Sequence, residues 1–248
     1  MPKQNFYSLN FQDLKTFLIE KIGVEESKVK MRAQQLYKGI YQKGITSFTD
    51  LTTVTLELRK ELDNALSLEL PKILKTEVAG DKTIKWLLEL NDENKNLIEV
   101  VLIPSKSHNT ICVSVQVGCA MSKNSACIHC ATGTQLLVKN LSASEIVMQM
   151  MIAKRHLNDF GDQRLLSRVV LMGSGEPLTN YKETKQFIKI LMDPEGIRMG
   201  KKSITLSTIG VPDKIIQFAS PGKFSKTANW FFLMPFLAPK GTINLLFK

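Results

Sequence analysis

All four cysteines of this 248-residue chain lie in one short segment, at Cys112, Cys119, Cys127 and Cys130. Cysteine thiolates bind zinc and iron–sulfur clusters and act as nucleophiles, whereas structural disulfides need an oxidising compartment. Because the rest of the chain has no cysteine, this clustering predicts metal or redox chemistry rather than a disulfide framework.

The last three cysteines are separated by seven and then two residues within a single loop. Three thiolates suit a [4Fe-4S] cluster that leaves one iron open to a ligand from outside the protein, whereas a structural zinc site needs four protein ligands. His129 could supply the fourth zinc ligand, but it lies inside the Cys127–Cys130 spacing. The residues favour a cluster, and zinc remains the alternative.

Two other polar segments follow apolar runs that are typical of strands. The first is Gly173-Ser-Gly175-Glu176-Pro, and the second is Ser207-Thr208. Glycines allow a ligand to approach the backbone, and Glu176 can accept hydrogen bonds from an amino group or from ribose hydroxyls. An ordinary strand–helix turn at the first segment and a helix cap at the second are the alternatives.

The first 70 residues have the apolar spacing of helices. Asn10 can cap a helix from Phe11 to Ile22, a second helix contains residues 33–41, and Asp50 is expected to begin a third. The second helix region also carries five basic side chains, which indicate either a solvated face or an RNA-facing one, at Lys28, Lys30, Arg32, Lys38 and Lys43.

From Pro71 onward, short β-type runs appear and are then followed by alternating strands and helices. The strands are expected at 73–78, 83–90, 97–103, 111–117, 168–172 and 203–206, with helices beginning at Ser142, at Asn180 and near Val211. Ser142 and Glu145 have the spacing of a capping box. This alternation predicts a parallel sheet or barrel, with the cysteine loop at the carboxyl end of a strand, where such folds build their sites.

The positive charge is concentrated in the second part of the chain. Residues 1–95 contain 15 basic and 14 acidic side chains, and residues 96–248 contain 18 and 9, so the net charges are +1 and +9. A phosphate backbone is the commonest partner of such a surface, and solvated lysines are the alternative explanation. The charge therefore predicts a polyanionic partner.

The chain contains no run of about 18 apolar residues that could cross a membrane. Its longest apolar run, residues 230–238, is short and is interrupted by Pro235, and the first residues lack the apolar segment of a secretory signal. These features predict a cytoplasmic protein with no membrane contact.

Several short motifs follow one another in the order in which they occur in a known family. They run from about Asn10 to Phe218 and comprise Arg32-Ala-Gln-Gln-Leu-Tyr-Lys-Gly-Ile-Tyr41, Ile98-Glu99-Val, Cys112-Val-Ser-Val-Gln-Val-Gly-Cys119, Cys130-Ala-Thr-Gly-Thr134, Gly175-Glu-Pro-Leu178 and Leu206-Ser-Thr208. In these motifs the chain resembles the RlmN-type radical S-adenosylmethionine (SAM) methyltransferases of the RlmN/Cfr family. That family methylates carbon 2 of an adenosine in 23S ribosomal RNA and in some transfer RNAs.

The resemblance implies the cofactors and their ligands. Cys119, Cys127 and Cys130 match the ligands of the [4Fe-4S] cluster, whose open iron binds the amino and carboxylate groups of S-adenosyl-L-methionine. Two further SAM contacts are implied, one to the SAM amino group at Gly175 and Glu176 and the other at Ser207. Reduction of the cluster then cleaves SAM to a 5′-deoxyadenosyl radical.

The resemblance also implies catalytic residues and partners. Glu99 matches the proposed proton acceptor, and Cys112 matches the cysteine that releases the RNA adduct through a transient disulfide. Taken alone, Glu99 could be a polar strand position and Cys112 a small buried side chain. The expected partners are 23S rRNA, tRNA and an electron donor, with no membrane or DNA, and a complete enzyme is expected to be a monomer.

The resemblance implies an α/β fold with three parts: an N-terminal helical RNA-binding domain at 1–70, a β-rich connector at 71–110 and a radical SAM barrel domain at 111–248. The family spaces its cluster cysteines by three and two residues, and its later barrel motifs do not follow Phe218 here. A partial, C-terminally truncated barrel is therefore expected.

No cysteine follows Cys130, so the family's methyl-carrying cysteine has no counterpart, and the complete reaction is not expected from this polypeptide alone. The alternatives are a catalytically inactive RNA-binding remnant and a zinc-binding RNA module.

Overall fold

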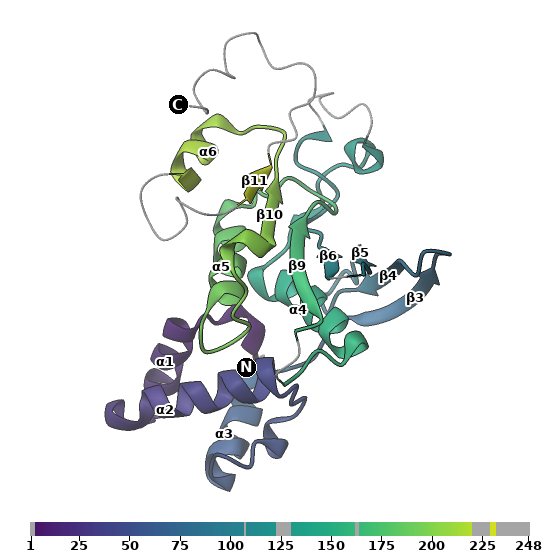
Figure 1. The fold of residues 1–248 in the computed structure, drawn as a ribbon. Coiled ribbons are helices and arrows are strands. Elements are labelled where there is room, and N and C mark those ends of the chain that lie inside the picture. The colour runs from purple at the N-terminus through teal and green to yellow at the C-terminus, as the bar shows by residue number, and fades with distance from the viewer. Residues whose placement is uncertain (1–2, 107, 123–129, 162–163, 220–228, 232–248) are drawn as a thin grey trace.

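The N-terminal part of the chain is a small helical domain (Figure 1). The computed structural model describes residues 3–106, 108–122, 130–161, 164–219 and 229–231. The helices of this domain are α1 (Phe11–Glu20), α2 (Glu26–Tyr37) and α3 (Leu56–Ala65). Short elements flank and connect them. β1 (Gln4–Asn5) and η1 (Phe6–Ser8) precede α1, η2 (Lys38–Gln42) and η3 (Phe48–Asp50) lie between α2 and α3, and β2 (Leu66–Ser67) follows α3 and pairs with β1 in parallel.

Capping residues explain where these helices begin. The Asn10 side chain accepts from the N–H groups of Gln12 and Asp13, so the predicted start of α1 is confirmed. The predicted start of the third helix at Asp50 is wrong. Asp50 ends the short turn η3, and α3 begins only at Leu56, where the Thr55 side chain caps the Leu58 N–H group.

The rest of the described chain forms a seven-stranded mixed sheet with helices. Its strand order is β11-β10-β9-β6-β5-β4-β3, with β11, β10, β9 and β6 parallel and β5, β4 and β3 antiparallel. Over the described residues the sheet is open, with β3 and β11 as its edges. The predicted α/β class is therefore confirmed. The strands are β3 (Lys72–Val78), β4 (Ile84–Glu89), β5 (Leu97–Ile103), β6 (Asn109–Cys112), β9 (Leu166–Leu171), β10 (Ile204–Ser207) and β11 (Asn229–Phe231).

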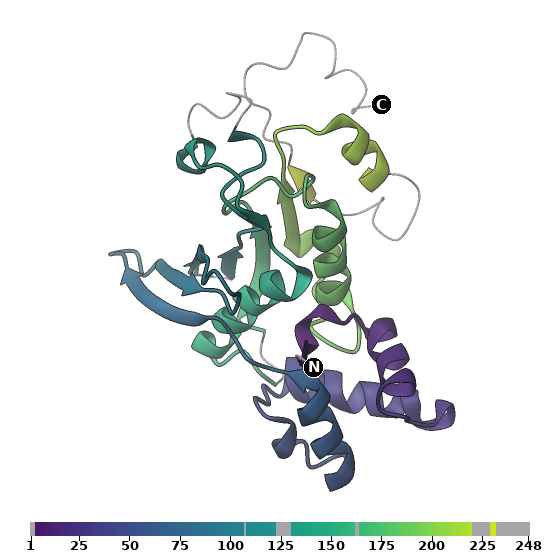
Figure 2. The same ribbon diagram turned by 180° about the vertical axis from the view of Figure 1, so that it is seen from behind.

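Three helices follow the parallel strands: α4 (Ala143–Leu157), α5 (Tyr181–Met192) and α6 (Pro212–Ala219). The capping box at the start of α4 is present, since the Ser142 side chain accepts from the Glu145 N–H and the Glu145 side chain accepts from the Ser142 N–H. In Figures 1 and 2, the helical domain lies at one end of the molecule, and α6 and the segment around Cys130 lie at the other.

The single strand predicted at 111–117 is wrong, because the structure divides it. β6 ends at Cys112, and residues 116–117 form β7, which pairs with β8 (Lys139–Asn140) in a separate two-stranded ribbon. Between them, the Val113 N–H donates to Val170 O and the Val115 N–H donates to Ser174 O. The chain therefore leaves the edge of β5 and follows the loop after β9.

The two faces of the sheet differ in exposure, as the period of two along β5 shows. Ile98, Val100 and Leu102 are buried in the main core, whereas Glu99 and Ile103 are exposed. One face packs against the helices. The opposite, more exposed face carries Glu99 and Ile103, and we call it the inner face.

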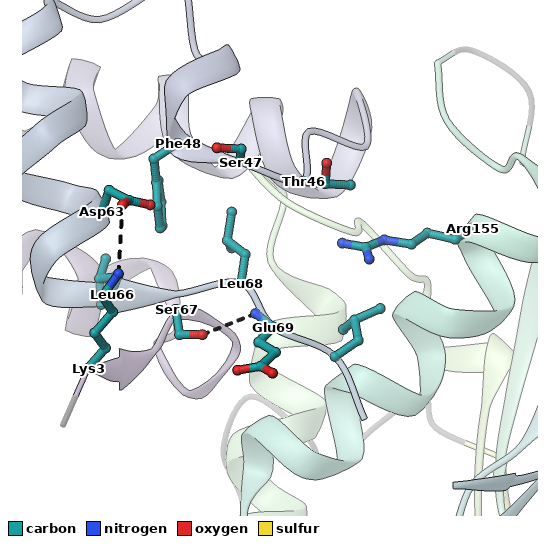
Figure 3. A pocket seen from close by; sticks show the side chains of 11 residues that line it. Lys3, Thr46, Ser47, Phe48, Asp63, Leu66, Ser67, Leu68, Glu69 and Arg155 are labelled. Carbon is teal, nitrogen blue, oxygen red and sulfur yellow. Dashed lines mark hydrogen bonds and ion pairs between the residues drawn. The ribbon is translucent and has the colours of Figure 1, made fainter. Parts of the chain in front are cut away.

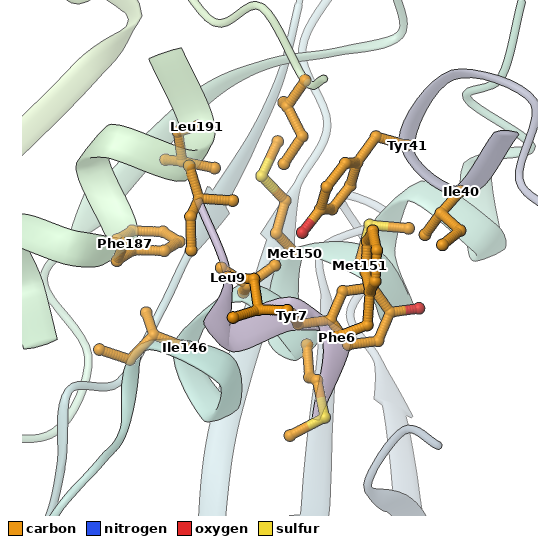
Figure 4. Packing of buried hydrophobic residues seen from close by; sticks show 14 of the residues in the cluster. Phe6, Tyr7, Leu9, Ile40, Tyr41, Ile146, Met150, Met151, Phe187 and Leu191 are labelled. Carbon is orange, nitrogen blue, oxygen red and sulfur yellow. The ribbon is translucent and has the colours of Figure 1, made fainter. Parts of the chain in front are cut away.

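An aromatic cluster attaches the helical domain to α4 (Figure 4). Phe6 and Tyr7 on η1 are fully buried, and their side chains lie beside Tyr41 and the α4 methionines Met150 and Met151. The rings of Phe6 and Tyr41 are 5.8 Å apart. Because cores are closely packed, this contact holds the helical domain against the sheet domain.

We expect Phe6→Ala to lower the free energy of unfolding by about 3–5 kcal/mol, because it removes a fully buried ring and leaves a cavity. Urea unfolding followed by circular dichroism measures the change. Leu56→Ala is the control, since Leu56 is 63% exposed, and it should shift stability by less than about 0.5 kcal/mol. Equal effects of the two substitutions would contradict the role of Phe6 in the core.

Candidate functional site at the carboxyl ends of the parallel strands

Two of the predicted cluster ligands lie at the rim of the sheet. Cys119 follows β7 and is buried, and its N–H group donates to Gln135 O at 3.1 Å. Cys130 is exposed and begins the turn η5 (Ala131–Thr134). The third predicted ligand, Cys127, lies outside the described residues.

The surroundings of Cys119 connect the cysteine loop to the loop after β9. Burial raises the pKa of the Cys119 thiol, the N–H of Met121 opposes this rise, and the negative charges of Glu176 and Cys130 add to it. The Met121 N–H lies 3.5 Å from the Cys119 Sγ. Among the described residues, no group of three histidine, cysteine or acidic side chains is placed to bind a metal ion.

Glu176 joins the loop after β9 to the loop after β10. Its side chain is 3% exposed. Oε1 accepts from the Leu178 N–H at 2.9 Å and from the Thr208 hydroxyl at 2.7 Å, and Oε2 accepts from the Ile209 N–H at 2.9 Å. The carboxylate, which the sequence suggested as an acceptor for a ligand, is thus occupied by donors of the chain itself.

The three predicted SAM contacts lie in these same loops. Gly175 precedes Glu176, and Ser207 is the half-buried last residue of β10, next to Thr208. The Thr132 hydroxyl, two residues after Cys130, lies 3.4 Å from the Ser174 hydroxyl. The structure therefore brings three segments to one rim of the sheet. They are the described part of the cysteine loop (residues 119–134), the loop after β9 (residues 173–177, called the glycine loop) and the end of β10.

Glu99 and Cys112 lie on the inner face of the sheet, on neighbouring strands. Cys112 pairs with Val101, which is two residues from Glu99, so the two side chains project from the same face. Burial raises the pKa of the Cys112 thiol. Glu99 forms an ion pair with Lys85 at 3.2 Å and borders a pocket of about 270 Å³ with Lys75, Glu77, Lys85 and Leu87.

Sequence analysis assigned no separate role to two buried polar residues at the rim: it did not single out Gln116, and it noted Thr208 only as part of the Ser207-Thr208 segment. Gln116 is fully buried and hydrogen-bonds to both the cysteine loop and the glycine loop. Thr208 is 2% exposed and donates to Glu176. One sequence signal could have identified Gln116, namely a polar residue between two apolar ones in Val115-Gln116-Val117. A buried amide needs hydrogen-bond partners, so such a residue is expected to hold other segments of the chain.

A polar pocket of about 300 Å³ lies far from this rim, between the helical domain and the end of α4 (Figure 3). Arg155 points into it from α4, Lys3 pairs with Asp63 at 3.7 Å, and the Ser67 hydroxyl accepts from the Glu69 N–H. None of the predicted site residues lines this pocket.

Comparisons with known proteins agree with the fold. Residues 4–68 match the family model of the ribosomal RNA large subunit methyltransferase N-terminal domain. A radical SAM methyltransferase from Sphaerobacter thermophilus has a similar structure, with a TM-score of 0.77 and 31% identity, over 92% of this chain and 62% of that one.

Two relatives named dual-specificity RNA methyltransferase RlmN are also similar. The one from Rhodopseudomonas palustris strain BisB18 is 40% identical over 206 residues, which are 79% of this chain and 51% of the relative. The one from Ruegeria sp. strain TM1040 is 38% identical over 224 residues, or 88% and 55%. The chain thus spans about half the length of the curated relatives it matches.

The fold is similar to that of a radical SAM methyltransferase. Within that class, the chain is related by sequence to the RlmN family, as its motifs predicted. No helix among the described residues is long and apolar enough to cross a membrane.

We expect Glu176→Gln to lower the free energy of unfolding by about 1–3 kcal/mol, because an NH₂ group cannot accept from Thr208 or Ile209. The Ile209 amide should also exchange with solvent faster, as measured by NMR. Glu93→Gln, in an exposed turn, is the control and should change neither quantity. An unchanged Ile209 exchange rate in Glu176→Gln would show that the carboxylate does not hold this loop.

Proposed function

We propose that this chain carries the cofactor-binding part of a radical SAM methyltransferase that acts on RNA. In this proposal Cys119, Cys127 and Cys130 bind a [4Fe-4S] cluster, and SAM lies against the loops of Gly175–Glu176 and Ser207. The observation that supports it best is the convergence of these loops on one rim, where hydrogen bonds join the loop after Cys119, the loop after β9 and the loop after β10.

The surroundings of Cys119 and Cys130 fit a thiolate-ligated cluster. The Met121 N–H near Cys119 Sγ is the kind of donor that stabilises a ligating thiolate, and the exposed Cys130 leaves room for a bound group. When bound, such a cluster supplies the electron that cleaves SAM reductively. The residues of the chain hold the cluster at the rim and place SAM beside it.

The glycine loop would meet SAM through its backbone. The Glu176 carboxylate already accepts three hydrogen bonds within the chain, and the carbonyl groups of Ser174 and Glu176 accept from other residues of the chain. The Gly175 carbonyl group would therefore accept from the SAM amino group. Ser207 ends β10 next to this loop, so its half-buried hydroxyl is positioned to contact the same ligand.

The inner face of the sheet would receive the RNA base, and we propose carbon 2 of an adenosine in 23S rRNA or tRNA as the target. Glu99 and Cys112 project from this face, where Glu99 would accept a proton and Cys112 would resolve the adduct. The relatives are named RNA methyltransferases. Residues 96–248 carry a net charge of +9, which would attract a phosphate backbone.

Anaerobic reconstitution with iron and sulfide tests the cluster. The wild-type chain should bind about four irons and absorb light at about 400 nm. Cys119→Ser should lower the iron content, because one ligand is lost. Cys112→Ser is the matched control, since Cys112 lies outside the proposed ligand set, and it should retain the iron.

Other results would contradict the cluster. Retention of zinc without colour would identify a zinc-binding RNA module, and binding of neither metal would identify an RNA-binding remnant. Equal iron content in Cys119→Ser and wild type would exclude Cys119 as a ligand.

Labelled SAM tests the reaction. All four cysteines lie between residues 112 and 130, and the proposal assigns three to the cluster and one to adduct resolution, so none is left to carry the methyl group. The reduced, iron-loaded chain should therefore cleave SAM but transfer no label to 23S rRNA or tRNA. Stoichiometric RNA methylation by this chain alone would overturn that assignment.

A further inference from the structure

We propose that Gln116 is a positioning residue that fixes the spacing between the cysteine loop and the glycine loop. Its side-chain oxygen is one acceptor shared by both loops, and it therefore couples the proposed cluster site to the proposed SAM site. This inference rests on the proposed function and adds a residue to which that function assigns no role.

The four hydrogen bonds of the Gln116 amide carry the argument. Oε1 accepts from the Ala120 N–H at 3.2 Å and from the Glu176 N–H at 2.9 Å. Nε2 donates to Asn140 Oδ1 at 2.6 Å and to the Thr179 hydroxyl at 3.0 Å. A glutamine amide offers two acceptor and two donor positions, so every one of them is used.

The position of these partners explains what the amide controls. Ala120 directly follows Cys119, a predicted cluster ligand, and Glu176 is itself a predicted SAM contact that directly follows another, Gly175. The shared oxygen therefore joins the two predicted sites. Asn140 lies just before the cap of α4, and Thr179 just before α5. A shift of the Gln116 side chain would therefore move both loops together.

Packing keeps Gln116 in this place. The residue is fully buried, and a Cβ atom built on Gly175 would lie 2.5 Å from the Gln116 Cβ. Gly175 also has a φ of +99°, which a residue with a side chain rarely adopts. The glycine loop can approach β7 this closely only because position 175 has no side chain.

A second buried glutamine provides a matched control. Gln149 is also fully buried, and its amide bonds to the backbone of Ser114 and to Glu145 O, with no direct bond to Ala120 or Glu176. It reaches the glycine loop only through Ser114, whose hydroxyl accepts from the Ser174 N–H. Gln116→Met and Gln149→Met therefore remove the same chemical group from equally buried positions. Only the first should release the loops.

Amide hydrogen exchange of the full, metal-free chain, measured by NMR, tests the coupling. In Gln116→Met the amides of Ala120 and Glu176 should exchange about tenfold faster than in wild type, whereas Gln149→Met should leave both rates unchanged. If Gln116→Met does not fold, Gln116→Asn, which withdraws the amide by one methylene, takes its place.

A measurement on the iron-loaded chain separates positioning from general stability. Gln116→Met should bind iron as wild type does, but it should bind SAM about tenfold more weakly and lose the SAM-induced change in the electron paramagnetic resonance spectrum of the reduced cluster. Gln149→Met should retain both. Unchanged SAM affinity in Gln116→Met, or equal losses in both variants, would overturn the proposal.

The result distinguishes this inference from the proposed function. If wild type binds no iron while the amides of Ala120 and Glu176 still depend on Gln116, the proposed function fails and the coupling of the loops stands. If wild type binds iron and SAM but the two amides are insensitive to Gln116, the proposed function stands and the coupling fails.

Discussion

The loops after β7, β9 and β10 are held together by buried polar atoms rather than by apolar side chains. Gln116, Glu176 and Thr208 are each at most 3% exposed. A carboxylate without water costs several kcal/mol unless donors surround it, and the donors to Glu176 come from its own loop and from the loop after β10. Each loop is therefore stable in its observed position only while the others keep theirs. This mutual dependence is what gives the rim a defined shape.

The features that sequence analysis predicted correctly depend on neighbouring residues, and those it missed depend on distant ones. The start of α4 was predictable because Ser142 and Glu145 satisfy each other's backbone groups within three residues. The start of α3 was not, because Asp50 and Thr55 are both good capping residues and packing decided between them. The interruption after Cys112 and the role of Gln116 arise from contacts with residues about 60 positions away in the chain, such as Ser174 and Glu176. No local pattern encodes such contacts.

The helical domain and the rim stand at opposite ends of the molecule (Figures 1 and 2). The aromatic cluster around Phe6 packs the helical domain onto α4, and α4 itself begins at the rim, three residues after Asn140. The same helix thus touches both ends. The distance between the helical domain and the rim is therefore set by the length of one helix.

The close approach of Gly175 to Gln116 also has a consequence for evolution. These positions are 59 residues apart in sequence, yet any side chain at 175 would occupy the space of the Gln116 Cβ and Cγ atoms. A larger residue at 175 could be tolerated only after position 116 had become smaller, but that first change removes the hydrogen bonds that both loops need. A side chain at position 175 therefore disturbs packing while Gln116 is present, and a smaller residue at position 116 loses these hydrogen bonds while Gly175 is present. Neither substitution is expected to be accepted alone. The pair is expected to persist unchanged in related chains, even where the surrounding loops gain or lose residues.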